Sequence, residues 1–167
     1  VLDLKHFWEI LTKPLFLYTF NKTTMAGKKY RTVMLIDDNE IDNLINQKMI
    51  EAASISDNIY THTGAKSAIE FLRNMEKLDV ADQVLPDVIF LDIDMPLMDG
   101  FEVLREIRGY VHLKNIPLYV ITTSRDKDHR KMALELGATG FYSKGASSRD
   151  IRKIMKEICR ECFEPGV

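Results

Sequence analysis

Short apolar segments alternate with amphipathic segments from about residue 30 onward. Runs of strand length and β-rich composition predict five strands, at residues 32–37, 58–63, 86–92, 116–124 and 139–144. Apolar residues spaced three or four positions apart predict five helices, over residues 40–54, 64–78, 100–109, 127–137 and 147–163. Strands that alternate with helices predict an α/β fold, in which a doubly wound, five-stranded parallel sheet is built with right-handed crossovers.

The same periodicity predicts which helix faces are buried. The buried face of the first helix is predicted to hold Ile41, Leu44, Ile45, Met49 and Ala52. The buried face of the second is predicted to hold Ala65, Ala68, Ile69 and Leu72. Gly137 stands at the end of the fourth helix, where glycine best adopts a left-handed cap.

The first 29 residues differ from the rest of the chain. Residues 1–31 contain six Lys or Arg and two acids, a net charge of +4, so the remainder carries −6 of the total of −2. Apolar residues from Leu4 to Leu11 have helical spacing, and Pro14 should interrupt that helix. We therefore expect residues 1–29 to be an extension, helical in part, outside a core domain spanning residues 30–167. An amphipathic docking helix is the alternative.

The overall composition excludes several classes of protein. A net charge of −2 gives no electrostatic case for binding nucleic acid, and no apolar run is long enough to cross a membrane. A cytoplasmic location is expected. Cys159 and Cys162 form a CxxC pattern near the predicted end of the last helix, where the helix dipole disfavours a thiolate. Packing, rather than redox chemistry or zinc binding, is expected of them.

Polar residues follow four of the five predicted strands. In a parallel sheet these carboxyl ends lie at one edge, where ligands bind. The residues at these ends are Asp37 and Asp38, then Asp92 and Asp94, then Thr122, Thr123 and Ser124, and finally Ser143 and Lys144.

This set of side chains suits phosphoryl transfer to an aspartate. Asp37, Asp38 and Asp92 would repel one another unless a cation joined them, and hard divalent ions such as Mg²⁺ prefer oxygen ligands. Asp92 could then act as nucleophile, because carboxylates form acyl phosphates. The hydroxyl of Thr122 and the ammonium of Lys144 could each bind a phosphoryl oxygen.

From about Tyr30 to Phe163 the chain resembles a response-regulator receiver domain of two-component signalling. The motifs that carry the resemblance are "LIDDNE", "VIFLDIDMPLMDGFEVL", "YVITTS" and "GATGFYSKG", in that order. The resemblance implies a flavodoxin-like sheet with strand order 2-1-3-4-5. It also implies that phosphate comes from a sensor histidine kinase or a phosphotransfer protein. No output domain is expected after the last helix, so output by contact with a downstream protein, with a homodimer among the assemblies, is expected.

The resemblance also implies a role for each site residue. Asp92 would be the phosphoacceptor, with Mg²⁺ held by Asp37, Asp38, Asp92 and the backbone carbonyl of Asp94. Thr122 would be the switch hydroxyl and Lys144 the phosphate-pairing lysine. Phe141 would turn inward upon phosphorylation.

Two positions depart from the family pattern. Gly145 stands where proline usually follows the lysine, and the Lys144–Gly145 bond is expected to be trans because a cis bond before a non-proline residue costs ~3–4 kcal/mol. Asp94 occupies a variable position two residues after the phosphoacceptor. We expect Asp94 to point outward at the mouth of the site and, with Ser124, to tune the lifetime of the phosphoryl group.

Two other functions are compatible with parts of the sequence. "LDIDMP" resembles the DxD element of haloacid-dehalogenase-type phosphatases, but that element normally follows the first strand. Turnover of a small phosphate ester would support this alternative. An unphosphorylated receiver-like binding module is the second alternative, and it would require a missing site residue. The receiver interpretation predicts a protein that catalyses only its own phosphorylation and dephosphorylation.

Overall fold

The computed structural model describes residues 30–52, 55–78, 85–96 and 99–144. Five parallel strands form one sheet in the order β2-β1-β3-β4-β5, as predicted. The strands are β1 (Tyr30–Ile36), β2 (Ser56–His62), β3 (Val88–Leu91), β4 (Leu118–Thr122) and β5 (Gly140–Ser143). The helices are α3 (Glu40–Ala52), α4 (Ala65–Glu76), α5 (Gly100–Gly109) and α6 (Lys127–Glu135).

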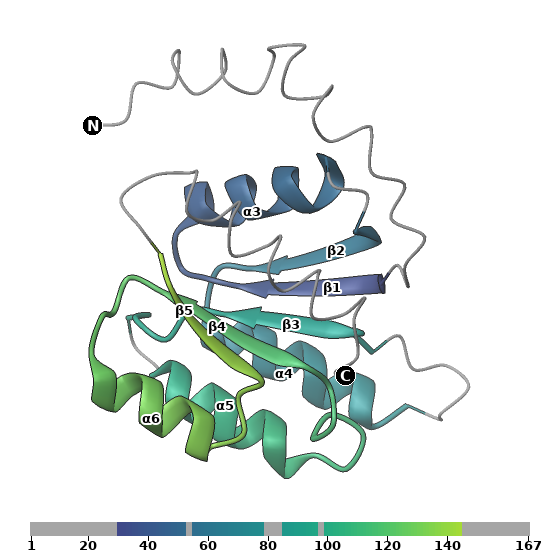
Figure 1. Ribbon diagram of the computed structural model, residues 1–167. Coiled ribbons are helices and arrows are strands. Elements are labelled where there is room, and N and C mark those ends of the chain that lie inside the picture. The colour runs from purple at the N-terminus through teal and green to yellow at the C-terminus, as the bar shows by residue number, and fades with distance from the viewer. Residues whose placement is uncertain (1–29, 53–54, 79–84, 97–98, 145–167) are drawn as a thin grey trace, which may run out of the picture.

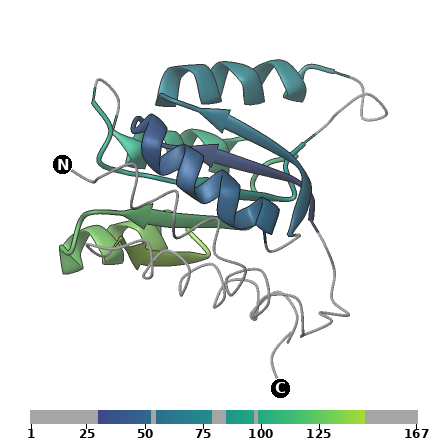
Figure 2. The same ribbon diagram turned by 90° about the horizontal axis from the view of Figure 1, so that it is seen from above.

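Helices cover both faces of the sheet, which makes the fold doubly wound (Figure 1). Helices α4, α5 and α6 pack on one face, over a core that includes Ile36, Leu91 and Val120. Helix α3 packs on the other face, over Leu35, Phe90 and Ile121. Viewed from above, α3 lies over the sheet (Figure 2). Adjacent residues of one strand therefore belong to different cores, as expected for strands buried on both sides.

The predicted face of α4 is confirmed, because the four residues predicted to lie on it are all buried. Gly137 follows α6 with a φ of +95°, which confirms the predicted left-handed cap.

The predicted buried face of α3 is partly wrong. Met49 is buried, but Ile41 and Leu44 are 58% and 49% exposed. Asn43 and Asn46 occupy the buried face instead. The side-chain amide of Asn43 donates to the carbonyl oxygens of Asp37 and His62, at 2.8 and 3.3 Å. These hydrogen bonds tie α3 to the ends of β1 and β2, and Ile41 and Leu44 are thereby left toward solvent.

Several predictions concern residues that lie outside the described part of the chain. They are the extension over residues 1–29, the closing helix over residues 147–163, the CxxC pair and the bond between Lys144 and Gly145. The domain boundary at residue 30 likewise stays a prediction. Among the described residues, no helix combines the length and apolar character that crossing a membrane requires.

Candidate functional site

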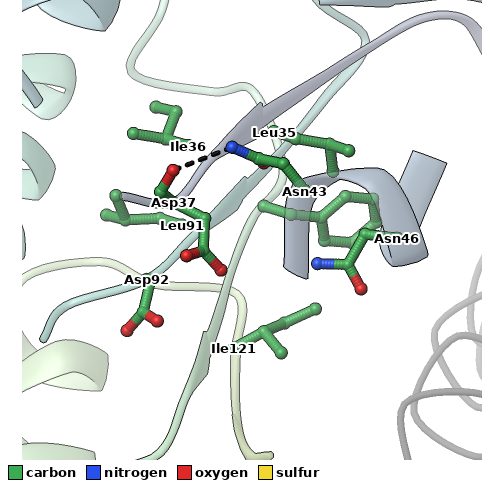
Figure 3. Close-up of a pocket in the computed structure, with 9 residues that line it drawn as sticks. Leu35, Ile36, Asp37, Asn43, Asn46, Leu91, Asp92 and Ile121 are labelled. Atoms are coloured by element: carbon green, nitrogen blue, oxygen red, sulfur yellow. Dashed lines mark hydrogen bonds between the residues drawn. The ribbon is translucent and has the colours of Figure 1, made fainter. Parts of the chain in front are cut away.

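The register of the sheet brings the predicted acids together. Ile36 of β1 is aligned with Leu91 of β3, so the next residues, Asp37 and Asp92, leave the sheet side by side. Both are buried, at 4% and 5% exposure. Figure 3 shows their carboxylates at the same edge of the sheet. A pair of buried carboxylates requires a compensating cation.

Lys144 supplies that cation from the end of β5. Its Nζ lies 2.5 Å from Oδ2 of Asp37, 2.6 Å from Oδ2 of Asp92 and 2.9 Å from Oδ2 of Asp42. The backbone N–H of Lys144 donates to the carbonyl of Thr122, which fixes β5 beside β4. The lysine side chain is 5% exposed, so the ion pairs lie in a poorly hydrated environment.

Burial and charge act in opposite directions on these groups. Burial raises the pKa of Asp37 from 3.8 to about 6, although the attraction of Lys144 opposes the change. Burial disfavours the charged form of Lys144, but the neighbouring Asp92 and Asp37 outweigh it and raise the pKa of the lysine. The ammonium is therefore charged throughout the physiological pH range.

Further hydrogen bonds fix the orientation of the two buried acids. Oδ1 of Asp92 accepts from the backbone N–H of Asp94 at 2.9 Å, and Oδ1 of Asp37 accepts from the backbone N–H of Asn39 at 2.9 Å. Each carboxylate thus has one oxygen bound to backbone and the other bound to Lys144. Such a carboxylate is held in one rotamer before any substrate arrives.

A small pocket lies between these acids and α3 (Figure 3). It is lined by Asp37, Asp92, Asn43, Asn46 and neighbouring apolar residues. Its volume of about 10 Å³ is close to that of one water-sized sphere. The side-chain oxygens of Asn43 and Asn46 are buried and accept no hydrogen bond from the residues that the structure describes. The pocket therefore offers polar partners to a solvent molecule behind the carboxylates.

Asp94 lies at the exposed mouth of the site, and its carboxylate is held by hydroxyl groups at the end of β4. The residue is exposed, but Oδ2 of Asp94 accepts hydrogen bonds from the hydroxyls of Thr122 and Thr123, both at 2.8 Å. Burial opposes ionisation of Asp94, yet the bonds from the two threonines prevail and lower its pKa. The carboxylate reaches back toward β4 because two hydroxyl donors lie there. The Thr122 hydroxyl is therefore engaged by Asp94 in this structure.

The remaining predicted positions lie near this edge. Oγ of Ser124 is 2.8 Å from Nδ1 of His129 in α6, and the His129 ring packs edge-on against Phe101. Phe141 is 4% exposed and belongs to the core. The predicted inward turn of Phe141 requires an exposed ring at the start, and in this structure the ring is already buried.

The predicted metal ligands are only partly assembled. Asp37 and Asp92 converge on one cation, the ammonium of Lys144, whereas Asp38 is exposed and makes no side-chain hydrogen bond within the described residues. No group of three His, Cys, Asp or Glu side chains in that part of the chain is arranged to hold a metal unaided. A Mg²⁺ site at this edge would thus need water ligands, which is usual for Mg²⁺.

Asp42, which contacts Lys144, was missed from the sequence. Thr123, which shares Asp94 with Thr122, was named at the strand end but was given no role. An acid in the first turn of a helix is usually explained by the helix dipole. The signal that could have singled out Asp42 is its place in the helix that follows β1, whose first turn starts at the ligand-binding edge.

Comparison with known proteins agrees with this geometry. A family model described as the response regulator receiver domain matches residues 33–156. The chain belongs to this family. The receiver domain is a module of two-component signalling. The acidic pair follows β1 and Asp92 follows the central strand β3, so the phosphatase alternative, which needs its DxD element after the first strand, is not favoured.

Individual relatives include stand-alone regulators and a larger kinase. The receiver domain is 27% identical to response regulator Rcp1 of Synechocystis over 77% of this chain and 86% of Rcp1. The Mn²⁺-bound form of Rcp1 superimposes with a TM-score of 0.69, covering 82% of this chain and 97% of Rcp1. The phosphorylated cyanobacterial phytochrome response regulator RcpA gives 0.71 at 27% identity, covering 83% and 97%. Sensor histidine kinase CheAY of Helicobacter pylori is 32% identical over 74% of this chain, which spans 14% of that protein.

Proposed function

We propose that Asp92 accepts a phosphoryl group from the phosphohistidine of a sensor histidine kinase or phosphotransfer protein. An oxygen of Asp92 attacks phosphorus, and the P–N bond to the donor histidine breaks, its electron pair returning to the imidazole. The observation that supports this most is the position of Asp92, which follows the central strand with its carboxylate paired to Lys144 at 2.6 Å. Hydrolysis of the acyl phosphate restores the carboxylate.

Charge compensation is the main contribution of the surrounding residues. Lys144 is charged and nearly free of solvent, so its ammonium can bind a phosphoryl oxygen without first losing a hydration shell. Thr122 lies at the end of the adjacent strand and can donate its hydroxyl once it leaves Asp94.

The residues present fit a divalent cation. Oxygens of Asp37 and Asp92 already converge on an ammonium, and Asp38 lies exposed beside Asp37. Asp37, Asp38, Asp92 and the carbonyl of Asp94 would hold Mg²⁺, which supplies further compensation of phosphoryl charge. The related Rcp1 has been crystallised in a Mn²⁺-bound form, which supports the choice of a divalent ion.

The output is proposed to be contact with a downstream protein. RcpA, which matches this chain over most of both lengths, is a phytochrome response regulator. A cytoplasmic location and a phosphorylation-dependent homodimer are part of the same proposal. Size-exclusion chromatography with and without Mg²⁺ and beryllofluoride tests the change in assembly.

Labelling with acetyl phosphate and Mg²⁺ tests the phosphoacceptor. Wild-type protein should acquire one hydroxylamine-sensitive phosphoryl group, and Asp92→Asn should acquire none while keeping its fold by circular dichroism. Asp128→Asn, which alters an exposed acid in the first turn of α6, is the matched control and should label normally. Undiminished labelling of Asp92→Asn would refute the assignment. Multiple turnover of a small phosphate ester would favour the phosphatase, and no labelling of wild type would favour the binding module.

A further inference from the structure

Lys144 has no donor to spare in this structure. A lysine ammonium has three N–H bonds, and three carboxylate oxygens lie within hydrogen-bond distance of Nζ, from Asp37, Asp42 and Asp92. A phosphoryl oxygen can bind Lys144 only if one of these partners releases it.

The proposed chemistry weakens two of the three contacts. When Asp92 becomes an acyl phosphate, its carboxylate loses its negative charge. Oδ2 of Asp37, which binds Lys144, belongs to a carboxylate that the metal ion also requires. Asp42 has neither task, so its contact with Lys144 can survive the reaction unchanged.

The position of Asp42 is fixed independently of Asp92. Asn39 accepts hydrogen bonds through its side chain from the backbone N–H groups of Ile41 and Asp42, at 3.0 and 3.3 Å, and so caps α3. The Asp42 side chain is 24% exposed, compared with 5% and 6% for those of Asp37 and Asp92. It is the outermost of the three carboxylates and is attached to a helix rather than to the loop that carries Asp92.

We propose that Asp42 is a positioning residue that keeps Lys144 at the site while Asp92 carries the phosphoryl group. This role rests on the proposed function of Asp92. Lys144 then exchanges one contact, from the carboxylate of Asp92 to a phosphoryl oxygen, while Asp42 holds the ammonium in place. Without Asp42, the lysine would lose its fixed position at the step where its charge matters most.

Labelling by acetyl phosphate in saturating Mg²⁺ measures this role. Asp42→Asn should label roughly 10- to 100-fold more slowly than wild type, the range expected when a charged group is displaced by about 1 Å. Glu40→Gln is the matched control, because it removes one negative charge from an exposed residue in the same turn of α3. It should label within about twofold of wild type. Asp42→Glu, which keeps the charge, should recover most of the rate and guards against a loss of fold in the amide variant.

A double-mutant cycle with Lys144→Met separates positioning from simple charge. In the Lys144→Met background, Asp42→Asn should change the labelling rate by less than about twofold. Equal slowing in both backgrounds would overturn the proposal, as would an Asp42→Asn rate equal to or above that of Glu40→Gln. A slow Asp42→Glu variant with intact fold would also overturn it. If wild type labels at Asp92 and only the Asp42 effect is missing, the proposed function stands; if wild type does not label, both fail.

Discussion

Replacement of Asp94 by asparagine should accelerate phosphorylation by small anionic donors. The carboxylate of Asp94 adds a negative charge beside that of Asp92 at the mouth of the site. Its position is fixed, because the backbone N–H of Asp94 donates to Asp92 and its carboxylate accepts from the hydroxyl of Thr122. Both features oppose the reaction. The charge repels the incoming phosphoryl group, and the hydrogen bond occupies the hydroxyl that should bind it.

The distance between the two charges sets the order of magnitude of the change in labelling rate. A phosphoryl group on Asp92 would lie roughly 5 Å from the Asp94 carboxylate, where one pair of unit charges repels by ~3 kcal/mol at an effective dielectric constant of about 20. Asp94 is exposed, and solvent screening reduces this to about 1–2 kcal/mol. Because ~1.4 kcal/mol changes a rate tenfold, Asp94→Asn should label roughly 5- to 30-fold faster. The neutral amide oxygen of asparagine also accepts the Thr122 hydroxyl more weakly than the carboxylate does, which acts in the same direction.

Labelling rates with acetyl phosphate at low and high salt provide the assay. The advantage of Asp94→Asn should be largest at about 0.05 M salt and should shrink at about 1 M, where the Debye length is ~3 Å. Asp128→Asn controls for net charge and should give no such advantage. Dephosphorylation half-lives should be measured in parallel, because a carboxylate can also orient the hydrolytic water. An Asp94→Asn variant that labels no faster than wild type at low salt would refute the repulsion argument.

Two further substitutions test the burial of the site. Because burial raises the pKa of Asp37 from 3.8 to about 6, the folded protein holds this proton more tightly than the unfolded chain, and the contribution of Asp37 to the free energy of unfolding should fall as the pH rises through this interval. In urea titrations, the free energy of unfolding of Asp37→Asn, relative to that of wild type, should rise by on the order of a few kcal/mol between pH 4 and pH 7. A difference that stays constant with pH would contradict the raised pKa of Asp37. Gly100→Ala would place a Cβ against the Cα of Ile93 and 2.6 Å from the carbonyl oxygen of Asp92, so it should destabilise the fold by ~1–3 kcal/mol and slow labelling. Gly109→Ala, which meets nothing within 4 Å, should do neither, and equal effects of the two glycine substitutions would contradict the steric argument.

The sheet and the convergence of charged residues could be predicted from the sequence because both depend on short-range patterns. Apolar runs marked the strands, and the first residue after each run marked the edge at which Asp37, Asp92 and Lys144 meet. Parallel topology then requires that these ends lie together.

The orientation of α3 and the partners of Asp94 could not be predicted in the same way. Periodicity predicts that Ile41 and Leu44 are buried, but they are exposed. The helix is oriented so that Asn43 faces the sheet and donates to two carbonyl groups at the ends of β1 and β2. A buried amide is favourable only when acceptors are in place, and those acceptors come from distant segments. Asp94 likewise finds its two donors at the end of β4, 28 and 29 positions along the chain.

The ion pairs of Lys144 also have a consequence for folding kinetics. They join residues that are 107, 102 and 52 positions apart, so they can form only after β5 has docked against β4 at the far edge from β1. Contacts between such distant residues form late and slowly in parallel α/β domains. A chain that has collapsed around β1 and β3 would therefore hold two buried acids without their counter-charge. In a refolding experiment, competence for labelling should recover after the apolar core does, so a signalling response reports a completely folded domain.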